Sequence, residues 1–149
     1  MKSLRNLLVL VAVIAFASCS DEYKVSKNLE GLWDISVYQK VVYKGNEVDF
    51  DNSGSWEEKG KIEFTSDGKG YFNILEDLGA GVYNGAADFT WTNTGTTVSI
   101  TTSNETKVFT IVSSEDNYFE LDRTVPNFYF SGSEPGVDYS LYERMVIEK

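Results

Sequence analysis

The feature that most constrains the fold is a two-residue alternation of apolar and polar side chains, which recurs along residues 29–149. No long window shows the 3.6-residue period of an amphipathic helix. In the segment 29–43, Trp33, Ile35 and Val37 are expected to share one face. Successive side chains of a strand point to opposite faces, so a segment of this kind buries one side. The pattern therefore predicts an all-β domain.

Turn-forming residues separate the alternating segments. Asp67-Gly68 is a hairpin signal, because glycine readily adopts the positive φ of a tight turn. The Gly-, Ser- and Asp-rich stretch 49–58 is expected to be a loop. In the later segment "YFELDR", Phe119 and Leu121 are expected to face inward.

The number and spacing of these segments favour one topology. About eight strands, spaced roughly 10–15 residues apart, are joined by short turns with no crossover helix. Neighbouring strands joined in this way form an antiparallel up-and-down meander. We expect the meander to close into a barrel, which removes exposed strand edges. The interior of an eight-stranded barrel is filled by side chains or holds one small ligand.

Several short motifs resemble those of lipocalins and of bacterial lipocalin-like lipoproteins. Gly31-Leu32-Trp33 is similar to the G-x-W at the start of the first lipocalin strand, and "FTSDG" resembles the F-x-x-D-G hairpin of the bacterial group. The last segments, "VFTIVSSEDNYFEL" and "LYER", also look like that group's final strands. The resemblance implies a lipocalin-like barrel in which Arg144 packs across Trp33. The chain departs from the family in having a long segment, 124–138, before the last strand.

The first residues have the pattern of an exported leader. Lys2 and Arg5 precede eleven uninterrupted apolar residues, 7–17, which is short for a membrane span of about 20 residues and typical of a signal-peptide core. The stretch "FASC" that follows resembles the lipobox of bacterial lipoproteins. The resemblance implies cleavage before Cys19 and attachment of fatty acyl chains, such as palmitate, to its sulfur. An ordinary secretory leader with an incidental cysteine is the alternative.

The leader and the alternating region divide the chain into three parts. We expect a signal peptide at residues 1–18, an acylated cysteine with a flexible tether at 19–28, and one barrel domain at 29–149. Ser20-Asp21-Glu22 resembles the short acidic export signal of Bacteroidetes-type lipoproteins. It implies an outer-membrane protein displayed at the cell surface, and a merely solvated tether is the alternative.

Composition excludes several functions. Removing residues 1–18 takes away two basic residues and no acidic ones, so the formal net charge changes from −10 to −12. A surface this acidic repels nucleic acids. The chain has no histidine and one cysteine, which excludes histidine-based triads, disulfides within the domain and zinc sites built on imidazole. No cofactor is expected.

The acidic stretch Asp49–Gly54 resembles the first half of an EF-hand loop, with oxygen-bearing side chains at alternate positions and then glycine. The bidentate glutamate of such a loop would fall on Gly60. We therefore expect a solvated acidic loop and no metal site.

Aromatic residues are the candidates for ligand contact. In "NFYF", three adjacent aromatic side chains lie in a predicted loop, where they either plug one barrel end or form an exposed contact patch. Trp33 and Arg144 are expected mainly as a core plug. The candidate binding residues are Trp33, Trp56, Phe89, Trp91, Phe128, Tyr129, Phe130 and Arg144.

These patterns predict a surface-anchored, lipocalin-like lipoprotein without enzymatic activity. Its barrel is expected to have an apolar interior and to bind a small apolar or glycan-like ligand. A filled barrel that acts as a protein-interaction scaffold, or as an accessory subunit of an outer-membrane complex, is the alternative. Paired carboxylates for glycoside hydrolysis are a distant third, because strand acids such as Glu120 and Asp122 are expected to face solvent.

Overall fold

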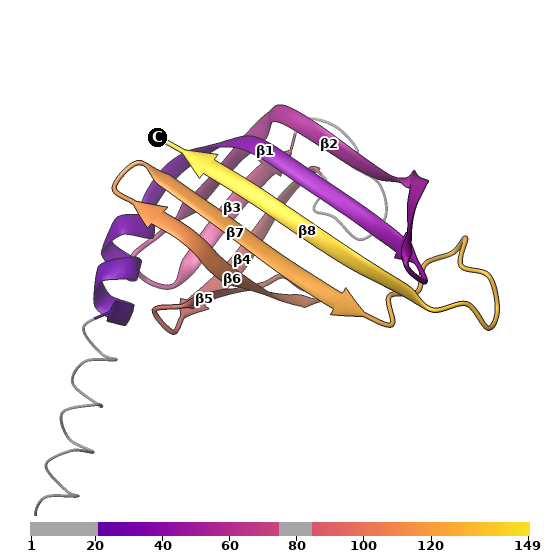
Figure 1. The fold of residues 1–149 in the computed structure, drawn as a ribbon. Helices are drawn as coiled ribbons and strands as arrows, with labels where there is room; N and C mark the ends of the chain where they lie inside the picture. The colour runs from indigo at the N-terminus through magenta and orange to yellow at the C-terminus, as the bar shows by residue number, and fades with distance from the viewer. Residues whose placement is uncertain (1–20, 75–84) are drawn as a thin grey trace, which may run out of the picture.

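Eight antiparallel strands pair in sequence order and the last pairs with the first, so the sheet closes into a barrel (Figure 1). The structure is a computed structural model that describes residues 21–74 and 85–149. The strands are β1 (Gly31–Lys44), β2 (Glu47–Phe64), β3 (Lys69–Ile74), β4 (Gly85–Asn93), β5 (Thr97–Thr101), β6 (Thr106–Glu115), β7 (Tyr118–Pro126) and β8 (Tyr139–Glu148). The predicted eight-stranded, up-and-down antiparallel barrel is confirmed.

The two ends of the barrel differ. The helix end is covered by a helix through residues 21–29, drawn in indigo in Figure 1, and also holds the C-terminus. Among the described residues, the loop end contains the β1–β2 turn at 45–46, the β5–β6 turn at 102–105 and the β7–β8 loop at 127–138. Because β1 runs from the helix end to the loop end, its successive inward side chains sample the whole depth of the barrel.

Residues 21–28 are helical, and the expectation of a flexible tether there is wrong. Val25 and Leu29 lie one helical turn apart, and both side chains are buried in the barrel core. Asn93 on β4 also donates a hydrogen bond to the Ser26 hydroxyl at 2.7 Å. The helix is thus stabilised by packing, which the polar local sequence does not reveal. Within the described residues, no helix is long and apolar enough to cross a bilayer.

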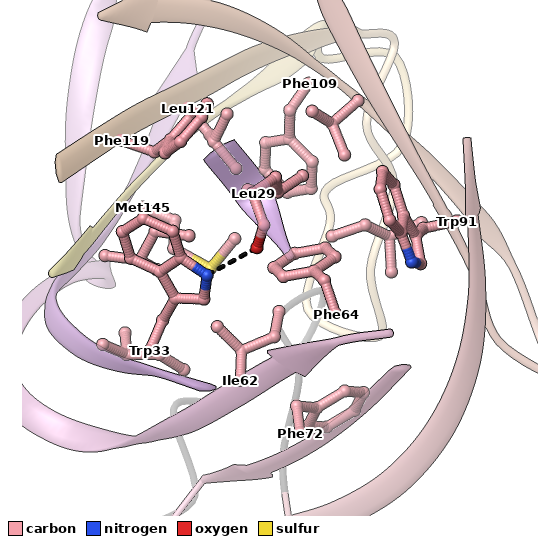
Figure 2. Close-up of a cluster of buried hydrophobic side chains, with 14 of the residues drawn as sticks. Leu29, Trp33, Ile62, Phe64, Phe72, Trp91, Phe109, Phe119, Leu121 and Met145 are labelled. Atoms are coloured by element: carbon pink, nitrogen blue, oxygen red, sulfur yellow. Dashed lines mark hydrogen bonds between the residues drawn. The ribbon is translucent and has the colours of Figure 1, made fainter. Parts of the chain in front are cut away.

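The main core fills the helix end. Figure 2 shows Leu29 at its centre, where the backbone oxygen of Leu29 accepts a 2.6 Å hydrogen bond from the Trp33 indole nitrogen. Other buried members of this core include Phe64, Phe109, Phe119, Leu121 and Met145. The sealing helix, rather than a cavity, therefore occupies this end.

A bulge in β1 changes which of its side chains point inward. Ile35 pairs with Ile147 of β8 and Val37 with the preceding residue, so β1 carries one extra residue at this point. Such an insertion reverses the alternation that follows. Beyond it, Tyr38, Lys40 and Val42 are buried, and the expectation that Val37 shares a face with Trp33 and Ile35 is wrong.

The stretch 49–58, expected as a loop, lies within the 18-residue strand β2. It pairs with β1, with a shift of register between Lys40 and Val42. The Ser53 hydroxyl accepts a hydrogen bond from the Val42 backbone nitrogen at 2.9 Å and donates one to the Asp49 carbonyl at 2.6 Å. Pairing with a neighbouring strand has overridden the low strand preference of Gly, Ser and Asp.

Candidate functional site

A row of charged side chains crosses the barrel interior. In the strand register, Glu143 on β8 lies directly opposite Arg123 on β7 and Lys40 on β1. Lys107, at the start of β6, also points inward and reaches the same carboxylate. These four residues, Lys40, Lys107, Arg123 and Glu143, are called the charged layer below.

Three donors converge on the Glu143 carboxylate. One oxygen accepts hydrogen bonds from the Tyr38 hydroxyl at 2.7 Å and from the Lys107 ammonium at 3.1 Å. The other oxygen accepts a hydrogen bond from Arg123 Nε, and the Arg123 guanidinium lies 5.6 Å from the centre of the Phe109 ring. Side chains from four strands therefore meet at one buried acid.

The charged layer is withdrawn from water. Lys107 and Glu143 are 0% exposed and Lys40 is 5% exposed. Among the described residues, the layer contains three cations and one carboxylate. Burying charge is costly, and an ion network of this kind is often no more stable than apolar residues of the same volume.

Burial perturbs both lysines of the layer. Desolvation lowers the pKa of Lys107 below its ordinary 10.5, and the Arg123 charge lowers it further, although Glu143 and Glu105 raise it. Desolvation likewise lowers the pKa of Lys40, against the opposing attraction of Glu143 and Asp49. The cost of desolvation thus exceeds the attraction of these carboxylates at both ammonium groups.

Apolar side chains border the layer on both sides. Toward the helix end, Leu121 and Met145 are the next inward residues of β7 and β8. Toward the loop end lies a second cluster, called the apolar cap, whose buried members are Val42, Tyr139 and Leu141 and whose half-buried members are Val125, Phe128, Phe130 and Val137. The charged layer therefore lies between two apolar regions.

The apolar cap includes part of the aromatic "NFYF" segment. The rings of Phe128 and Phe130 stack with centroids 5.7 Å apart, and Phe130 meets Tyr139 edge-on at 5.4 Å. Tyr129 points outward and is 62% exposed. The segment thus combines both expectations, with two rings in a plug and one at the surface.

A surface pocket of about 500 Å³ adjoins the apolar cap. It lies between the β1–β2 hairpin and the β7–β8 loop, where Lys44 forms a 2.5 Å ion pair with Glu134. Tyr139 lines this pocket and also packs in the cap. The loop end is therefore hollowed next to the side chains that cover the charged layer.

The other predicted aromatic residues belong to the main core. Trp33, Phe89 and Trp91 are buried there, and Trp56 is a half-buried neighbour. The Trp91 indole donates to the Thr65 carbonyl at 3.1 Å, which satisfies its polar atom within the protein. These four residues belong to the filled part of the barrel. They do not form one continuous surface with the aromatic residues of the apolar cap.

Arg144 does not pack across Trp33, contrary to expectation. Its side chain lies on the outer face of β8 and pairs with Glu120 on β7, with Nε and Oε1 2.6 Å apart. The ammonium of Lys149 lies over the Trp33 ring instead, 4.1 Å from its centroid. The cationic contact therefore exists, but the residue that makes it lies at the C-terminus, five positions beyond the predicted one.

Two expectations concern lipid and metal. Cys19 lies outside the described residues. Asp49–Gly54 is part of β2, and the described part of the chain contains no group of three or more Cys, Asp or Glu side chains placed to hold a metal ion.

The sequence analysis missed the charged layer, although a signal was present. Lys107 has the same parity as Phe109 in β6, and Glu143 has the same parity as Leu141 and Met145 in β8. A charged residue at an inward position of an otherwise apolar alternation is an anomaly that points to a functional site.

Comparison with known proteins gives a similar solved structure but no matching family. No protein-family model matches the sequence, and no curated protein matches it. Among solved structures, a lipocalin-like protein from Bacteroides uniformis is similar, with a TM-score of 0.47 and 14% sequence identity, over 82% of this chain and 98% of that one. With 14% identical residues, this similarity assigns no role to the chain.

Proposed function

We propose that this chain is a non-enzymatic binding protein, anchored to a membrane through lipid at Cys19, whose barrel holds a small ligand. The single observation that supports binding best is the charged layer inside the barrel. A barrel that is only a filled scaffold gains no evident stability from buried charge, because apolar side chains can fill the same volume. The presence of charged groups in the interior therefore favours a ligand-binding function over a filled scaffold.

The shape of the barrel supports entry from one side. The helix end is sealed by Val25, Leu29 and the main core. At the loop end, the apolar cap contains half-buried rings, and a pocket adjoins it. A ligand would reach the charged layer by displacing parts of the cap, in keeping with the general position of binding sites at the mouths of β-barrels.

The proposed anchor depends on the leader. The basic start, the apolar run at 7–17 and "FASC" resemble those of bacterial lipoproteins, and Ser20-Asp21-Glu22 supports an outer-membrane, surface-exposed position. Two or more fatty acyl chains on one cysteine are enough for stable attachment.

The absence of enzymatic activity is proposed from the chemistry of the sequence and the layer. No histidine is available as a general base near neutral pH. Glu143, the buried acid, is engaged by Tyr38, Lys107 and Arg123 at once. Both oxygens of this carboxylate are thus already occupied by donors of the protein itself.

A protein-interaction scaffold is the second candidate. Val108 and Val112 on β6 point outward and are 50% and 52% exposed. A partner protein that covers this strand would bury both side chains. This function needs no ligand inside the barrel, so the two candidates can be separated.

Native mass spectrometry of the acylated protein, recovered from its own host cells in mild detergent, tests the binding function. We expect a complex with a small molecule that is released when the protein is denatured. A chain that carries only its covalent lipid, recovered together with another protein, would contradict ligand binding and support the scaffold.

The anchor is tested separately with the variant Cys19→Ala. It should carry no fatty acyl chains and should lose the membrane attachment that these chains provide. Unchanged acylation or attachment of this variant would contradict the lipoprotein proposal.

A further inference from the structure

We propose that the outer face of β4, β5 and β6 is a contact surface for a second copy of this chain, so that two copies form a two-fold symmetric dimer. This inference goes beyond the ligand-binding function proposed above and does not depend on what the barrel holds. It also goes beyond the scaffold candidate, which does not specify the partner protein.

The outer face of these three strands carries short, uncharged side chains in two cross-strand rows. One row crosses from β4 through β5 to β6 at Thr92, Ser99 and Val108, and the other lies one outward position away. The six residues of the two rows, called the neutral face below, are Thr90, Thr92, Ser99, Thr101, Thr106 and Val108. Because all six side chains are short, another protein surface can approach the sheet closely.

The neutral face differs in charge from the walls of the barrel beside it. Charged residues make up 24% of the chain, yet none lies in either row. On one side, Glu63, Tyr71 and Asp88 form an outward row across β2, β3 and β4, and on the other, Glu120 and Asp122 lie on β7. The strand preference of Thr and Val explains why these residues occur in the face. It does not explain why charged residues are missing there, since the neighbouring strands accept them at outward positions.

β6 adds exposed apolar surface to the neutral face. Val108 is 50% exposed, and Val112, two outward positions further along β6, is 52% exposed. Thr110 lies between them and is also uncharged. Burying exposed valine side chains favours association with another surface.

The chemistry of the neutral face makes it complementary to itself. In a two-fold dimer the same patch of both copies meets, so each group must be able to pair with its own kind. A hydroxyl both donates and accepts hydrogen bonds, and the Thr101 and Thr106 hydroxyls already lie 2.9 Å apart across β5 and β6. Hydroxyls and valines can therefore pair with a second neutral face, whereas a row of carboxylates would repel its own copy.

The net charge of the chain favours the same contact. Without residues 1–18 the formal net charge is −12, so two copies repel each other over most orientations. Contact through the row of Glu63 and Asp88 would desolvate carboxylates that face their own copies. Contact through the neutral face leaves these carboxylates in water.

The position of the neutral face suits two copies on one membrane. β5 lies opposite β1 in the closed order of strands, so the face belongs to the wall between the helix end and the loop end (Figure 1). A two-fold axis along this wall keeps both helix ends on the same side. With the anchor proposed above, the lipids of both copies then enter the same membrane.

The experiment is sedimentation equilibrium of the full chain in a density-matched neutral detergent, with a reducing agent that prevents a disulfide through Cys19. The neutral face is smaller than the about 20–30 residues that each side of a standard interface contributes, so we expect a weak dimer. The protein concentration therefore runs from roughly 1 μM to about 300 μM. Each variant is also melted thermally to establish that it is folded.

The expected result for the wild type is a reversible monomer–dimer equilibrium. Ser99→Glu, in the middle strand of the face, should weaken dimerisation roughly tenfold or more, because it places like charges opposite each other. The matched control Tyr71→Glu adds the same charge at a 42% exposed position of β3 and should leave dimerisation unchanged.

A mixing experiment tests whether the neutral face meets itself. Ser99→Lys alone should weaken dimerisation as Ser99→Glu does. An equimolar mixture of the two variants should dimerise at least as tightly as the wild type, because opposite charges then face each other. A damaged fold does not produce this recovery.

Three results would overturn the inference. A wild-type chain that stays monomeric over the whole concentration range does not pair with itself. Equal weakening by Ser99→Glu and Tyr71→Glu would mean that net charge, and not the neutral face, controls association. Variants at Ser99 that do not recover on mixing would mean that the neutral face contacts some other surface. None of these results bears on ligand binding, which native mass spectrometry tests independently.

Discussion

Trp33 shows how single residues close the helix end. Its indole nitrogen donates to the Leu29 carbonyl, its ring meets Phe119 edge-on at 5.4 Å, and the Lys149 ammonium lies over it. One side chain therefore connects the sealing helix, β7 and the C-terminus. Its role is to fill the core and to donate a hydrogen bond to the last carbonyl group of the helix, since it lies away from the charged layer.

Replacing this residue tests that role. Trp33→Ala should lower the free energy of unfolding by about 3–5 kcal/mol, because it removes a fully buried ring and leaves a cavity. The neighbouring Leu32→Ala, whose side chain is 54% exposed, is the control and should change stability little. Chemical denaturation measures both, and a loss below about 1 kcal/mol for Trp33→Ala would mean that the ring is not a core residue.

At single positions, the sequence predicts apolar residues better than charged ones. Phe119 and Leu121 were expected to face inward and do so. Arg123 follows in the same alternation, but a sequence alone does not tell whether a long cationic side chain turns its head inward or lies along the barrel rim. The partner that holds it, Glu143, comes twenty residues later, so the pair is visible only in the strand register.

Among the elements, the helix at 21–29 determines how the barrel is sealed. Leu29 is 0% exposed at the centre of the main core. Leu29→Ala should therefore lower the free energy of unfolding by about 2–5 kcal/mol. Lys24→Ala on the exposed side of the same helix is the matched control and should have little effect. Equal effects of the two substitutions in chemical denaturation would show that the helix does not pack as a plug.

The strands β7 and β8 are also joined on the outer face. Two hydrogen bonds hold the pKa of Glu120 below its ordinary 4.5. The one donated by Arg144 has the larger effect, and the one donated by the Tyr118 hydroxyl, at 3.0 Å, has a smaller effect. A lowered carboxyl pKa stabilises the fold above pH 4.5, and this contribution is lost as the pH falls through the lowered value.

The corresponding prediction concerns Arg144→Met. The variant should be less stable than the wild type at pH 7, and the difference should shrink as the pH falls below 4.5, where Glu120 becomes protonated in both proteins. Denaturation midpoints measured across this range provide the comparison. A difference that is constant with pH would mean that the ion pair does not contribute through the charge of Glu120.

The sequence predicts the strands because most of them have one apolar face and end at turn residues. Gly68, in the predicted hairpin, has a positive φ of 78° between β2 and β3. The bulge in β1 and the long, polar β2 were not predicted, since both depend on pairing with distant strands. The helix was not predicted because Val25 and Leu29 are buried by strands that lie far from them in the sequence.

For the whole molecule, the helix end and the proposed anchor lie close together in the chain. Only Ser20 separates Cys19 from the described helix, and a single residue spans about 3.5 Å at most. A lipid at Cys19 would therefore hold the helix end against the membrane and direct the loop end, where we propose that the ligand enters, away from it.

This orientation can be measured with fluorescent labels on protein recovered from host membranes, in which we propose that lipid blocks Cys19. Asn117→Cys places a label in the β6–β7 turn at the helix end, and Tyr129→Cys places one at the loop end. A quencher in the lipid headgroups should quench the first label more strongly. Stronger quenching at position 129 would mean that the loop end faces the membrane.

For the whole molecule as well, the sequence predicts the fold better than it predicts the candidate site. An alternating pattern indicates which residues share a face, but not which inward residues lie at the same depth. Lys40 and Glu143 are far apart in the sequence and meet only because β8 pairs with β1 to close the barrel. Barrel closure was predicted, but the relative register of the first and last strands was not.

The central claim is that a ligand binds inside the barrel, and Met145 reports on it most directly. Met1 and Met145 are the two methionines of the chain, and Met145 is buried two residues from Glu143 on the same inner face. With carbon-13 in the methionine methyl groups, titration with the small molecule recovered in native mass spectrometry should shift the Met145 signal in step with binding. If this molecule binds while the Met145 signal does not move, the ligand lies outside the barrel and the account is contradicted.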